Sequence, residues 1–287
     1  MDGVLNIRKP TGLTSHDMLQ QVRKLSGIRK SGHAGTLDPF ASGVLLVLLG
    51  EARKAARLFT GLEKEYRALI YLGGVSDTLD STGEVKLTGA SAPPEDKISA
   101  AVSSFKGTYE YPVPEYSAKK INGKKFYEIK RAGGTPPERI QRSEIYEIAT
   151  EYIRYPLVRV RVRCSSGTYI RALARDIGEK LSTGGYLKEL SRTASGFWRL
   201  EDSVPPEDYK EGLTPLGDAL KQFPGLSVHS SAADGLKHGI PFGEDDIAGG
   251  GRSIPAGVFP VYAEEGGLIA LVEKEDGCFR ARRVFNL

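Results

Sequence analysis

The chain contains few of the residues that build disulfide-linked, metal-dependent or membrane-spanning proteins. Its 287 residues include only two cysteines, Cys164 and Cys278, which are 114 positions apart, so we expect reduced thiols rather than a disulfide framework. The four histidines show no HExxH spacing and no accompanying cysteine pairs, so we expect no metal site. No apolar run approaches the roughly 18 residues of a membrane span, and no charged segment precedes an apolar one at residues 1–4. We therefore expect no signal peptide, no membrane partner and a cytoplasmic location.

Motifs for nucleotide and cofactor binding are also absent. No Gly-Lys-Ser/Thr follows the glycines at positions 32, 35 and 43, and no GxGxxG opens a helix elsewhere, which argues against a phosphate loop and a dinucleotide site. The same absence counts against an RNA methyltransferase. The acids in 77–83 superficially resemble a calcium loop, but they are three positions apart and no Glu stands at the twelfth position. We interpret 77–83 as a polar hairpin turn and expect no cofactor.

Charge is distributed unevenly along the chain, although the net charge is only +4. Residues 201–287 hold eight Lys/Arg and fifteen Asp/Glu, a balance of −7, which leaves +11 for residues 1–200. Within residues 117–142, eight basic side chains stand against only Glu128 and Glu138. A basic body favours a polyanionic partner, and a solvated lysine-rich surface is the alternative.

Periodicity predicts an α+β fold. Thr14 and Ser15 can cap a helix that Gly27 ends, and 158–164 alternates so that its valines and Cys164 face inward. Further strands are expected at 4–7, 44–49 and 64–72, and further helices near 52–59 and 94–105. Because strands and helices mix without a βαβα repeat, we expect a largely antiparallel mixed sheet flanked by helices.

Turn residues predict two domains. After Pro224 and Gly225 the chain becomes glycine-rich, with short β-like pieces that are typical of a small β-barrel. We therefore expect one domain at 1–225 and a second at 226–287.

Asp38 is the candidate catalytic residue. It is the only acid in the glycine-rich stretch 32–43, and the apolar run 44–49 predicts a buried strand that would brace its loop. An Asp before Pro39 is also typical of a turn or a helix N-cap, so the local pattern alone leaves both interpretations open.

The motif GHAGTLDPFASGVL at residues 32–45 resembles the catalytic signature of the TruB family of tRNA pseudouridine synthases. Four further segments resemble the same family in the same order: KPTGLTS at 9–15, KEYR at 64–67, SGTYIR at 166–171 and LSRT at 190–193. The resemblance implies the pseudouridine synthase fold and isomerisation of a uridine in the T loop of tRNA. The C1′–N1 bond would break, the extruded uracil would rotate, and C5 would bond to the ribose without a cofactor. Nucleophilic attack and elimination at the ribose both stay open.

The resemblance also implies roles for individual residues. Asp38 would be the essential carboxylate, and Arg171 would pair with it. Because Asp38 must be ionised, we expect Arg171 to hold its pKa down. Tyr66 would stack on the extruded base and could accept a proton, which completes the expected catalytic set. The expected RNA-binding residues of the core are His33, Tyr169 and Leu190.

A basic insertion at about 113–147 resembles the segment with which the family closes over the T loop. Lysines and aromatic residues interleave there, a composition suited to phosphate contact and base stacking. The expected phosphate contacts are Lys119, Lys120, Lys124 and Lys125. The insertion favours a stand-alone bacterial enzyme over the related guide-RNA-dependent synthases, so we expect a monomer that uses no guide RNA.

The C-terminal segment 226–287 resembles the family's PUA RNA-binding module, which supports binding of the tRNA acceptor stem. Its balance of −7 disfavours a strong phosphate-binding role. The alternative function is a non-catalytic tRNA-binding or RNA-folding protein on the same scaffold. Asp38 argues against that alternative, because binding alone would favour Asn or Lys next to phosphates.

Overall fold

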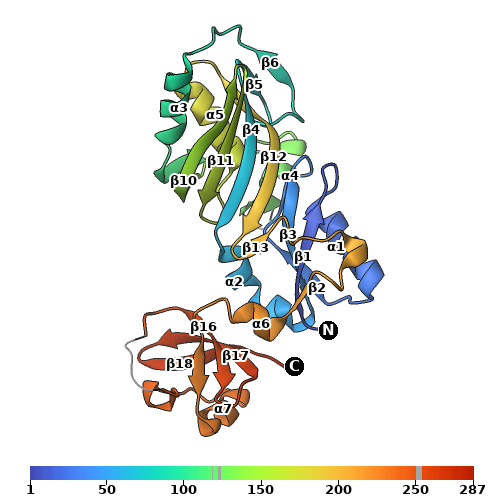
Figure 1. Ribbon diagram of the computed structural model, residues 1–287, viewed down its shortest axis with the longest axis vertical. Helices are drawn as coiled ribbons and strands as arrows, with labels where there is room; N and C mark the ends of the chain where they lie inside the picture. Colours follow the sequence, from blue (N-terminus) through green and yellow to red (C-terminus); the bar gives the residue numbers. More distant parts are fainter. Residues whose placement is uncertain (118, 122–123, 250–253) are drawn as a thin grey trace.

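The computed structural model describes residues 1–117, 119–121, 124–249 and 254–287, apart from the side chains of residues 120, 121, 124, 125, 127 and 131. The molecule is elongated. A large sheet occupies most of its length, and a four-stranded sheet lies at one end (Figure 1).

Ten strands form the large sheet, whose path runs β14-β1-β3-β12-β4-β11-β10-β7, with β2 paired to β3 and β13 paired to β12. In chain order the strands are β1 (Gly3–Lys9), β2 (Ser31–Ala34), β3 (Ser42–Leu49), β4 (Lys64–Leu72), β7 (Gly107–Pro112), β10 (Ile140–Arg154), β11 (Leu157–Cys164), β12 (Gly185–Ser195), β13 (Trp198–Arg199) and β14 (Leu213–Pro215). Among these described strands every pairing is antiparallel except that of β12 with β3. The expectation of a largely antiparallel mixed sheet is confirmed.

The single parallel pairing joins the two halves of the sheet. Its register is only two residues long, Ser191 with Ser42 and Arg192 with Gly43. Gly43 has a φ of +113°, and a Cβ at this position would lie 2.2 Å from the carbonyl oxygen of Arg192. Only glycine therefore permits this close approach of the two backbones.

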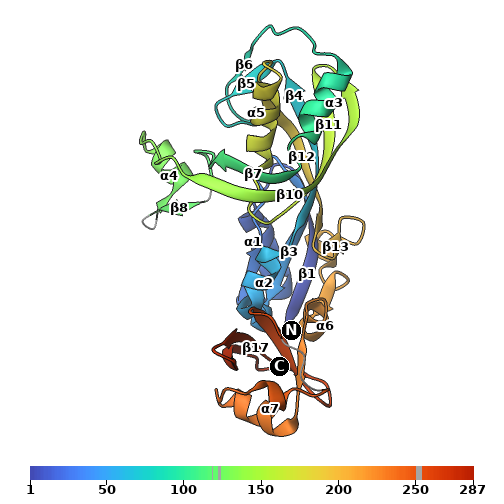
Figure 2. The ribbon, with the colours of Figure 1, turned by 90° about the vertical axis from the view of Figure 1, so that its left-hand side faces the viewer.

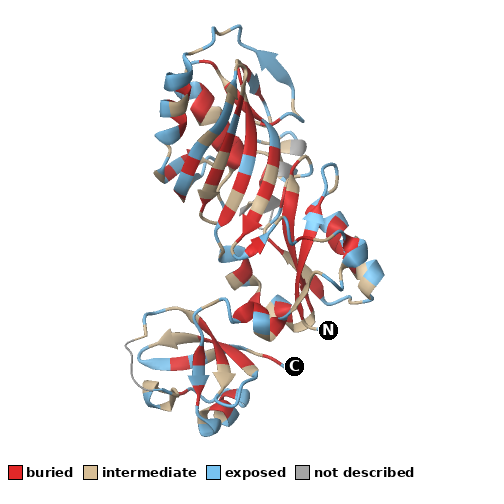
Figure 3. Ribbon diagram, in the orientation of Figure 1, coloured by how far each residue is buried: buried red, intermediate tan, exposed pale blue. Residues whose placement is uncertain are grey.

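Helices cover both halves of the sheet. The helices and 3₁₀ turns up to residue 225 are α1 (Ser15–Ser26), η1 (Gly50–Ala55), α2 (Ala56–Gly61), α3 (Glu95–Ser103), α4 (Phe126–Arg131), α5 (Ile170–Lys180), η2 (Pro206–Asp208) and α6 (Leu216–Leu220). Apolar residues of α3 and α5 share one buried cluster with β4, β11 and β12, whereas α1 packs on β1 and β3. Figure 3 shows buried residues running along the central strands.

Local expectations from the sequence are largely confirmed. Thr14 and Asp17 form a reciprocal capping box at the start of α1, and Gly27 ends that helix in the left-handed conformation. In β11 the side chains of the three valines and Cys164 are fully buried, as the alternation predicts. The turn at 77–83 connects β5 (Gly74–Ser76) and β6 (Val85–Leu87), a two-stranded hairpin.

Two local expectations were wrong in part. The glycine-rich stretch 32–43, expected to form the loop of Asp38, begins within β2, because the main chain of Ser31–Ala34 pairs with β3. The helix expected near 52–59 is divided into the 3₁₀ turn η1 and the short helix α2.

The basic insertion projects to one side of the large sheet (Figure 2). It contains β8 (Lys120–Ile121), β9 (Lys124–Lys125) and α4, and it returns through the long strand β10. The side chains of Lys120, Lys124 and Lys125 lie outside the described part of the structure.

The C-terminal unit is a sheet of order β15-β16-β17-β18 with one helix packed on it. Its elements are β15 (Leu226–Val228), α7 (Ser230–Lys237), η3 (Glu244–Asp246), β16 (Val258–Ala263), β17 (Leu268–Glu275) and β18 (Cys278–Val284). Leu271 and Phe285 from this unit share a buried cluster with Phe59 and Trp198 of the large body. Two hydrogen bonds, Lys54 Nζ to Val284 O at 2.8 Å and Asn286 N to Glu51 Oε2 at 3.0 Å, cross the same contact. Within the described ranges no helix is both long and apolar enough to cross a membrane.

We expect Phe285→Ala to lower the free energy of unfolding by about 3–5 kcal/mol, because the ring fills the buried cluster between the two units and its loss leaves a cavity. Chemical denaturation measures the change. Leu287→Ala is the matched control, since Leu287 is 64% exposed and should shift stability by less than about 0.5 kcal/mol. If Phe285→Ala lowers the free energy of unfolding no more than the control does, the C-terminal contact contributes nothing to folding.

Candidate active site

The loop that carries Asp38 is held in place by a buried lysine. Lys9 Nζ donates to the carbonyls of Pro10 at 2.9 Å, Pro39 at 3.3 Å and Ala41 at 2.6 Å. Burial lowers the pKa of this lysine to about 8, against the charge of Asp38, which raises it. One side chain from the end of β1 therefore fixes the part of the loop that follows Asp38.

A second clamp acts on the residue before Asp38. The Leu37 N–H donates to Ser15 Oγ at 2.9 Å, and Ser15 Oγ lies 3.2 Å from the carbonyl oxygen of Leu37. Because Ser15 is the first residue of α1, this helix and the loop are joined directly.

Asp38 pairs with Arg171, the second residue of α5. Arg171 Nε lies 2.9 Å from Asp38 Oδ2, and Arg171 Nη2 donates to Asp38 Oδ1 at 3.4 Å. The shorter contact has the distance of an ion pair, but its alignment is too poor for a hydrogen bond. Arg171 is buried, whereas 37% of the Asp38 side chain is exposed. The carboxylate thus has a held side and an open side.

Arg171 is also bound by two other segments. Its Nη1 donates to the Thr78 carbonyl at 2.9 Å, and its Nη2 donates to the Tyr116 carbonyl at 2.9 Å. The guanidinium therefore connects the catalytic loop, the 77–83 turn and the start of the basic insertion.

Asp80 is a site residue that the sequence interpretation missed. It is buried, and its Oδ2 lies 3.5 Å from Arg171 Nη1. Its Oδ1 accepts hydrogen bonds from Thr78 Oγ1 at 2.8 Å and from Thr82 N at 2.9 Å. The sequence showed only two acids in a polar turn. The contact with Arg171 joins residues 91 positions apart, and no local pattern predicts it.

The pKa of Asp38 is raised above its ordinary value, which contradicts the expectation that Arg171 would hold it down. Desolvation by the surrounding protein atoms is the largest cause, and the nearby charge of Asp80 acts in the same direction. The Arg171 guanidinium opposes both effects without cancelling them. Although part of the side chain is exposed, we infer a raised pKa because protein atoms crowd the carboxylate.

Tyr66, Tyr169 and Leu190 line one pocket with Asp38 and Arg171, with a volume of about 490 Å³. They come from β4, from the residue before α5, and from β12. The structure therefore brings together five of the six core residues that the sequence singled out.

Tyr66 lies against Arg192 in this pocket. Burial raises the pKa of the Tyr66 hydroxyl, and a hydrogen bond and charge from Arg192 oppose the shift only in part. Because the phenol stays protonated, Tyr66 is poorly suited to accept a proton, and it forms part of the pocket wall.

His33 and the insertion lysines are placed differently. His33 is on β2, half-buried, with a buried Nδ1 that has no hydrogen-bond partner among the described residues, and it is not among the residues that line the pocket. Lys119 does line the pocket, and its Nζ donates to Gln141 Oε1 at 3.2 Å.

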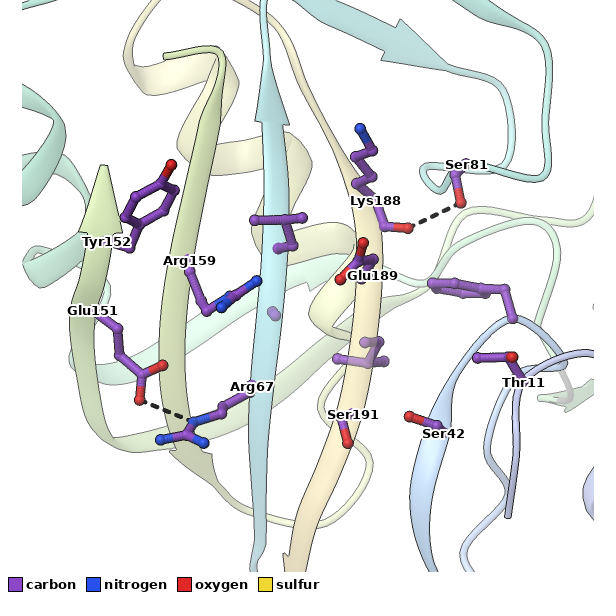
Figure 4. A pocket seen from close by; sticks show the side chains of 14 residues that line it. Thr11, Ser42, Arg67, Ser81, Glu151, Tyr152, Arg159, Lys188, Glu189 and Ser191 are labelled. Atoms are coloured by element: carbon purple, nitrogen blue, oxygen red, sulfur yellow. Dashed lines mark hydrogen bonds and ion pairs between the residues drawn. The ribbon is translucent and has the colours of Figure 1, made fainter. Parts of the chain in front are cut away.

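A larger hollow of about 970 Å³ lies over β10, β11, β4 and β12 and does not include Asp38 (Figure 4). Arg67 and Glu151 pair across it at 3.1 Å, and Ser81 Oγ donates to the Lys188 carbonyl at 3.0 Å. In this hollow the partner of Glu151 is the exposed Arg67, whereas the partner of Asp38 in the smaller pocket is the buried Arg171. The smaller pocket is therefore the candidate active site. Within the described part of the chain, no group of three or more His, Cys, Asp or Glu is placed to hold a metal ion.

Comparison with known proteins shows the family of the chain. Residues 23–170 match the family model described as TruB family pseudouridylate synthase (N terminal domain). The tRNA pseudouridine synthase B of Geobacter sulfurreducens is 36% identical over 304 residues and is covered completely, as is this chain. The protein of that name from Clostridium acetobutylicum is 43% identical, over 84% of this chain and 85% of its own. The chain belongs to the TruB family of pseudouridine synthases.

Solved structures show the same fold. A chain of a Cbf5-Nop10-Gar1 complex superimposes with a TM-score of 0.76 at 27% identity, over 99% of this chain and 84% of that one. An H/ACA RNP bound to a substrate RNA containing 2′-deoxyuridine gives a TM-score of 0.74 at 25% identity, over 99% and 85%. The pseudouridine synthase fold is confirmed, and the C-terminal sheet is consistent with a PUA-like module. As a TruB-family member the chain is an isomerase, so the non-catalytic alternative is not favoured.

We expect Asp80→Asn to lower the pKa of Asp38. Loss of the Asp80 charge removes an influence that raises this pKa and leaves Arg171 to act on Asp38 alone. The Asp38 carboxylate would then stay ionised to lower pH. Titration of its carboxyl carbon by ¹³C NMR measures the midpoint in both proteins.

Asp77→Asn is the matched control for this titration. Asp77 lies in the same turn, and its Oδ1 accepts from the Glu84 N–H at 2.8 Å rather than contacting Arg171. It should leave the Asp38 midpoint unchanged. An unchanged or higher midpoint in Asp80→Asn would contradict the coupling between the two acids.

Proposed function

We propose that this TruB-family chain converts a uridine in the T loop of tRNA to pseudouridine, with Asp38 as the catalytic carboxylate. The observation that carries the proposal is the Asp38–Arg171 pair at the wall of a pocket lined by Tyr66, Tyr169 and Leu190. A single carboxylate can suffice for an isomerisation that transfers no group and needs no redox partner.

Asp38 acts in its ionised form, either as a nucleophile toward the ribose or as the group that assists elimination there. Arg171 stabilises that form, because a fixed cation favours the carboxylate over the carboxylic acid. The open side of Asp38 is where the ribose would approach. The raised pKa makes the carboxylate a stronger base than a solvated Asp, which favours proton transfer or bond formation at that side.

The apolar and aromatic walls of the pocket suit an extruded base. Unpairing and unstacking a nucleotide cost a few kcal/mol, and stacking on a planar side chain offsets part of that cost. We assign the stacking role to Tyr66 and apolar contacts to Leu190 and Tyr169. His33 would fill the space that the extruded base leaves in the T loop of the tRNA, since His33 does not line the pocket itself.

Recognition of the tRNA is assigned to two further parts of the chain. The insertion would close over the T arm, and its Lys119, which already lines the pocket, would connect the insertion to the active site. The unit at 226–287 would contact the acceptor stem by shape and hydrogen bonding, since its charge is negative. We propose that the enzyme acts as a monomer without a guide RNA, with its catalytic domain at 1–225. Phe285 packs the unit at 226–287 against the large body.

We expect Asp38→Asn to abolish isomerisation while leaving tRNA affinity within a few-fold, because the amide keeps the packing but cannot act as a nucleophile or base. Release of tritium from tRNA labelled at uracil C5 measures turnover, since that carbon loses its hydrogen when it bonds to the ribose. Asp218→Asn, which alters an exposed ion pair with Lys221, is the control and should retain full activity. Appreciable single-turnover isomerisation by Asp38→Asn would refute the assignment.

Replacing Lys119, Lys120, Lys124 and Lys125 together by Ala should weaken tRNA binding and flatten its salt dependence. Each lost phosphate contact lowers the log–log slope by about 0.7–0.9. Filter binding at several salt concentrations measures the slope. The control removes four exposed lysines elsewhere, Lys86, Lys97, Lys210 and Lys221. Equal slopes for both variants would show that the insertion is not the RNA clamp.

A further inference from the structure

Among the described residues, two buried cations of the active-site pocket have no carboxylate partner. Lys64 is 4% exposed, and Arg192 is 1% exposed. Both line the pocket that contains Asp38. Across the described residues, neither forms an ion pair with an Asp or Glu, unlike Arg171, which has both Asp38 and Asp80.

The partners of Lys64 are main-chain oxygens. Its Nζ donates to the carbonyls of Thr60 at 2.7 Å and Leu62 at 2.5 Å, at the C-terminal end of α2. These carbonyls compensate part of the charge, and a structural cap on α2 is the competing explanation for this lysine. Two carbonyls use two of the three ammonium protons, so one donor remains available.

Arg192 is bound in the same manner. Its Nε donates to the Val44 carbonyl at 2.7 Å, and its Nη2 donates to the Gly35 carbonyl at 3.0 Å. A buried cation without a counter-charge is costly, and two such cations near each other cost more. Burial lowers the pKa of Lys64 to about 8, and the nearby charge of Arg192 contributes to this lowering.

The glycine loop keeps both cations within reach of a ligand. Gly35 has a φ of +87°, and a Cβ there would lie 3.5 Å from Arg192 Nη1 and 3.7 Å from Lys64 Cε. A side chain at position 35 would therefore stand against both groups. Glycine at this position leaves that space free beside the two cations.

We propose that Lys64 and Arg192 form a subsite for one of the two phosphates that flank the extruded uridine. A phosphodiester supplies the missing negative charge, and it accepts hydrogen bonds from an ammonium and a guanidinium at once. Its arrival would raise the pKa of Lys64, since an anion favours the protonated amine. Arg192 also contacts the Tyr66 hydroxyl, so the same residue would contact both the phosphate of the nucleotide and the ring on which its base stacks. The subsite rests on the proposed function.

The test combines a change in the protein with a change in the RNA. Affinity is measured for the wild type and Lys64→Met with a T-arm hairpin that carries either the natural phosphate or a neutral methylphosphonate on one side of the target uridine. Both RNAs carry a 2′-O-methyl ribose 5′ to that linkage. At one of the two positions, we expect the methylphosphonate and Lys64→Met each to weaken binding about tenfold, and the combination to weaken it no further.

If the losses of affinity from the methylphosphonate and from Lys64→Met multiply at both positions, the subsite is overturned. That result is expected if these cations bind an uncharged acceptor such as a uracil carbonyl. Lys64→Gln separates the subsite from a cap on α2, because its amide can donate to the two carbonyls without carrying charge. The subsite requires Lys64→Gln to bind as weakly as Lys64→Met, whereas a purely structural lysine would be rescued. Thermal unfolding of each variant shows that it is folded, and the Gln variant serves where Met fails to fold.

Lys54→Met is the matched control. Lys54 also donates to a carbonyl, that of Val284, but it pairs with Glu51 and does not line the pocket. It should leave affinity and the methylphosphonate effect unchanged. Pseudouridine formation on an unmodified hairpin is measured in parallel. If the wild type forms none, the proposed function fails together with the subsite, whereas isomerisation with multiplying losses overturns the subsite alone.

Discussion

The interaction on which the site depends is the shared coordination of Arg171. Its guanidinium contacts Asp38, Asp80 and the carbonyls of Thr78 and Tyr116, which belong to three segments far apart in the sequence. At the points of contact these segments belong to no helix or strand, and Asp80 forms only an isolated bridge with Leu187. Because loops lack the ladders that hold strands in register, the buried guanidinium supplies the missing restraint. Removal of this side chain would leave two acids close together and uncompensated.

A second constraint is the short parallel junction between β12 and β3. One half of the sheet contains Tyr66 on β4 and packs against α5, which bears Arg171, and the other contains β3, which follows the Asp38 loop. Arg192 lies at this junction with its backbone against Gly43 and its guanidinium bound to the Gly35 carbonyl. The same residue therefore closes the sheet and forms part of the pocket wall. A substitution there would change the fold and the site together.

Much of the local structure could be predicted from the sequence because its causes are local. The Thr14 cap, the Gly27 stop and the alternation of 158–164 each depend on neighbouring residues. Asp38 was found by its motif. Lys64 and Arg192 lie in the matched segments KEYR and LSRT but were given no role, and Asp80 was one acid of a polar turn. A charged residue in a turn or strand ordinarily predicts a solvated surface, and only the tertiary fold buries these three. The direction of the Asp38 pKa was missed for the same reason, since desolvation depends on atoms that the sequence does not place.

The division of Arg171 between two acids explains how Asp38 can be both held and reactive. A guanidinium that pairs with one carboxylate through two parallel hydrogen bonds stabilises the charge strongly and occupies both oxygens. Here Nη1 is used by Thr78 and Asp80, so Asp38 receives one close contact from Nε and a longer one from Nη2 at 3.4 Å. Desolvation, with the charge of Asp80, therefore leaves the pKa of Asp38 raised despite this pairing, and one side of the carboxylate stays exposed. An incoming ribose then meets a carboxylate that is oriented by its arginine and retains the basicity that bond formation or proton transfer requires.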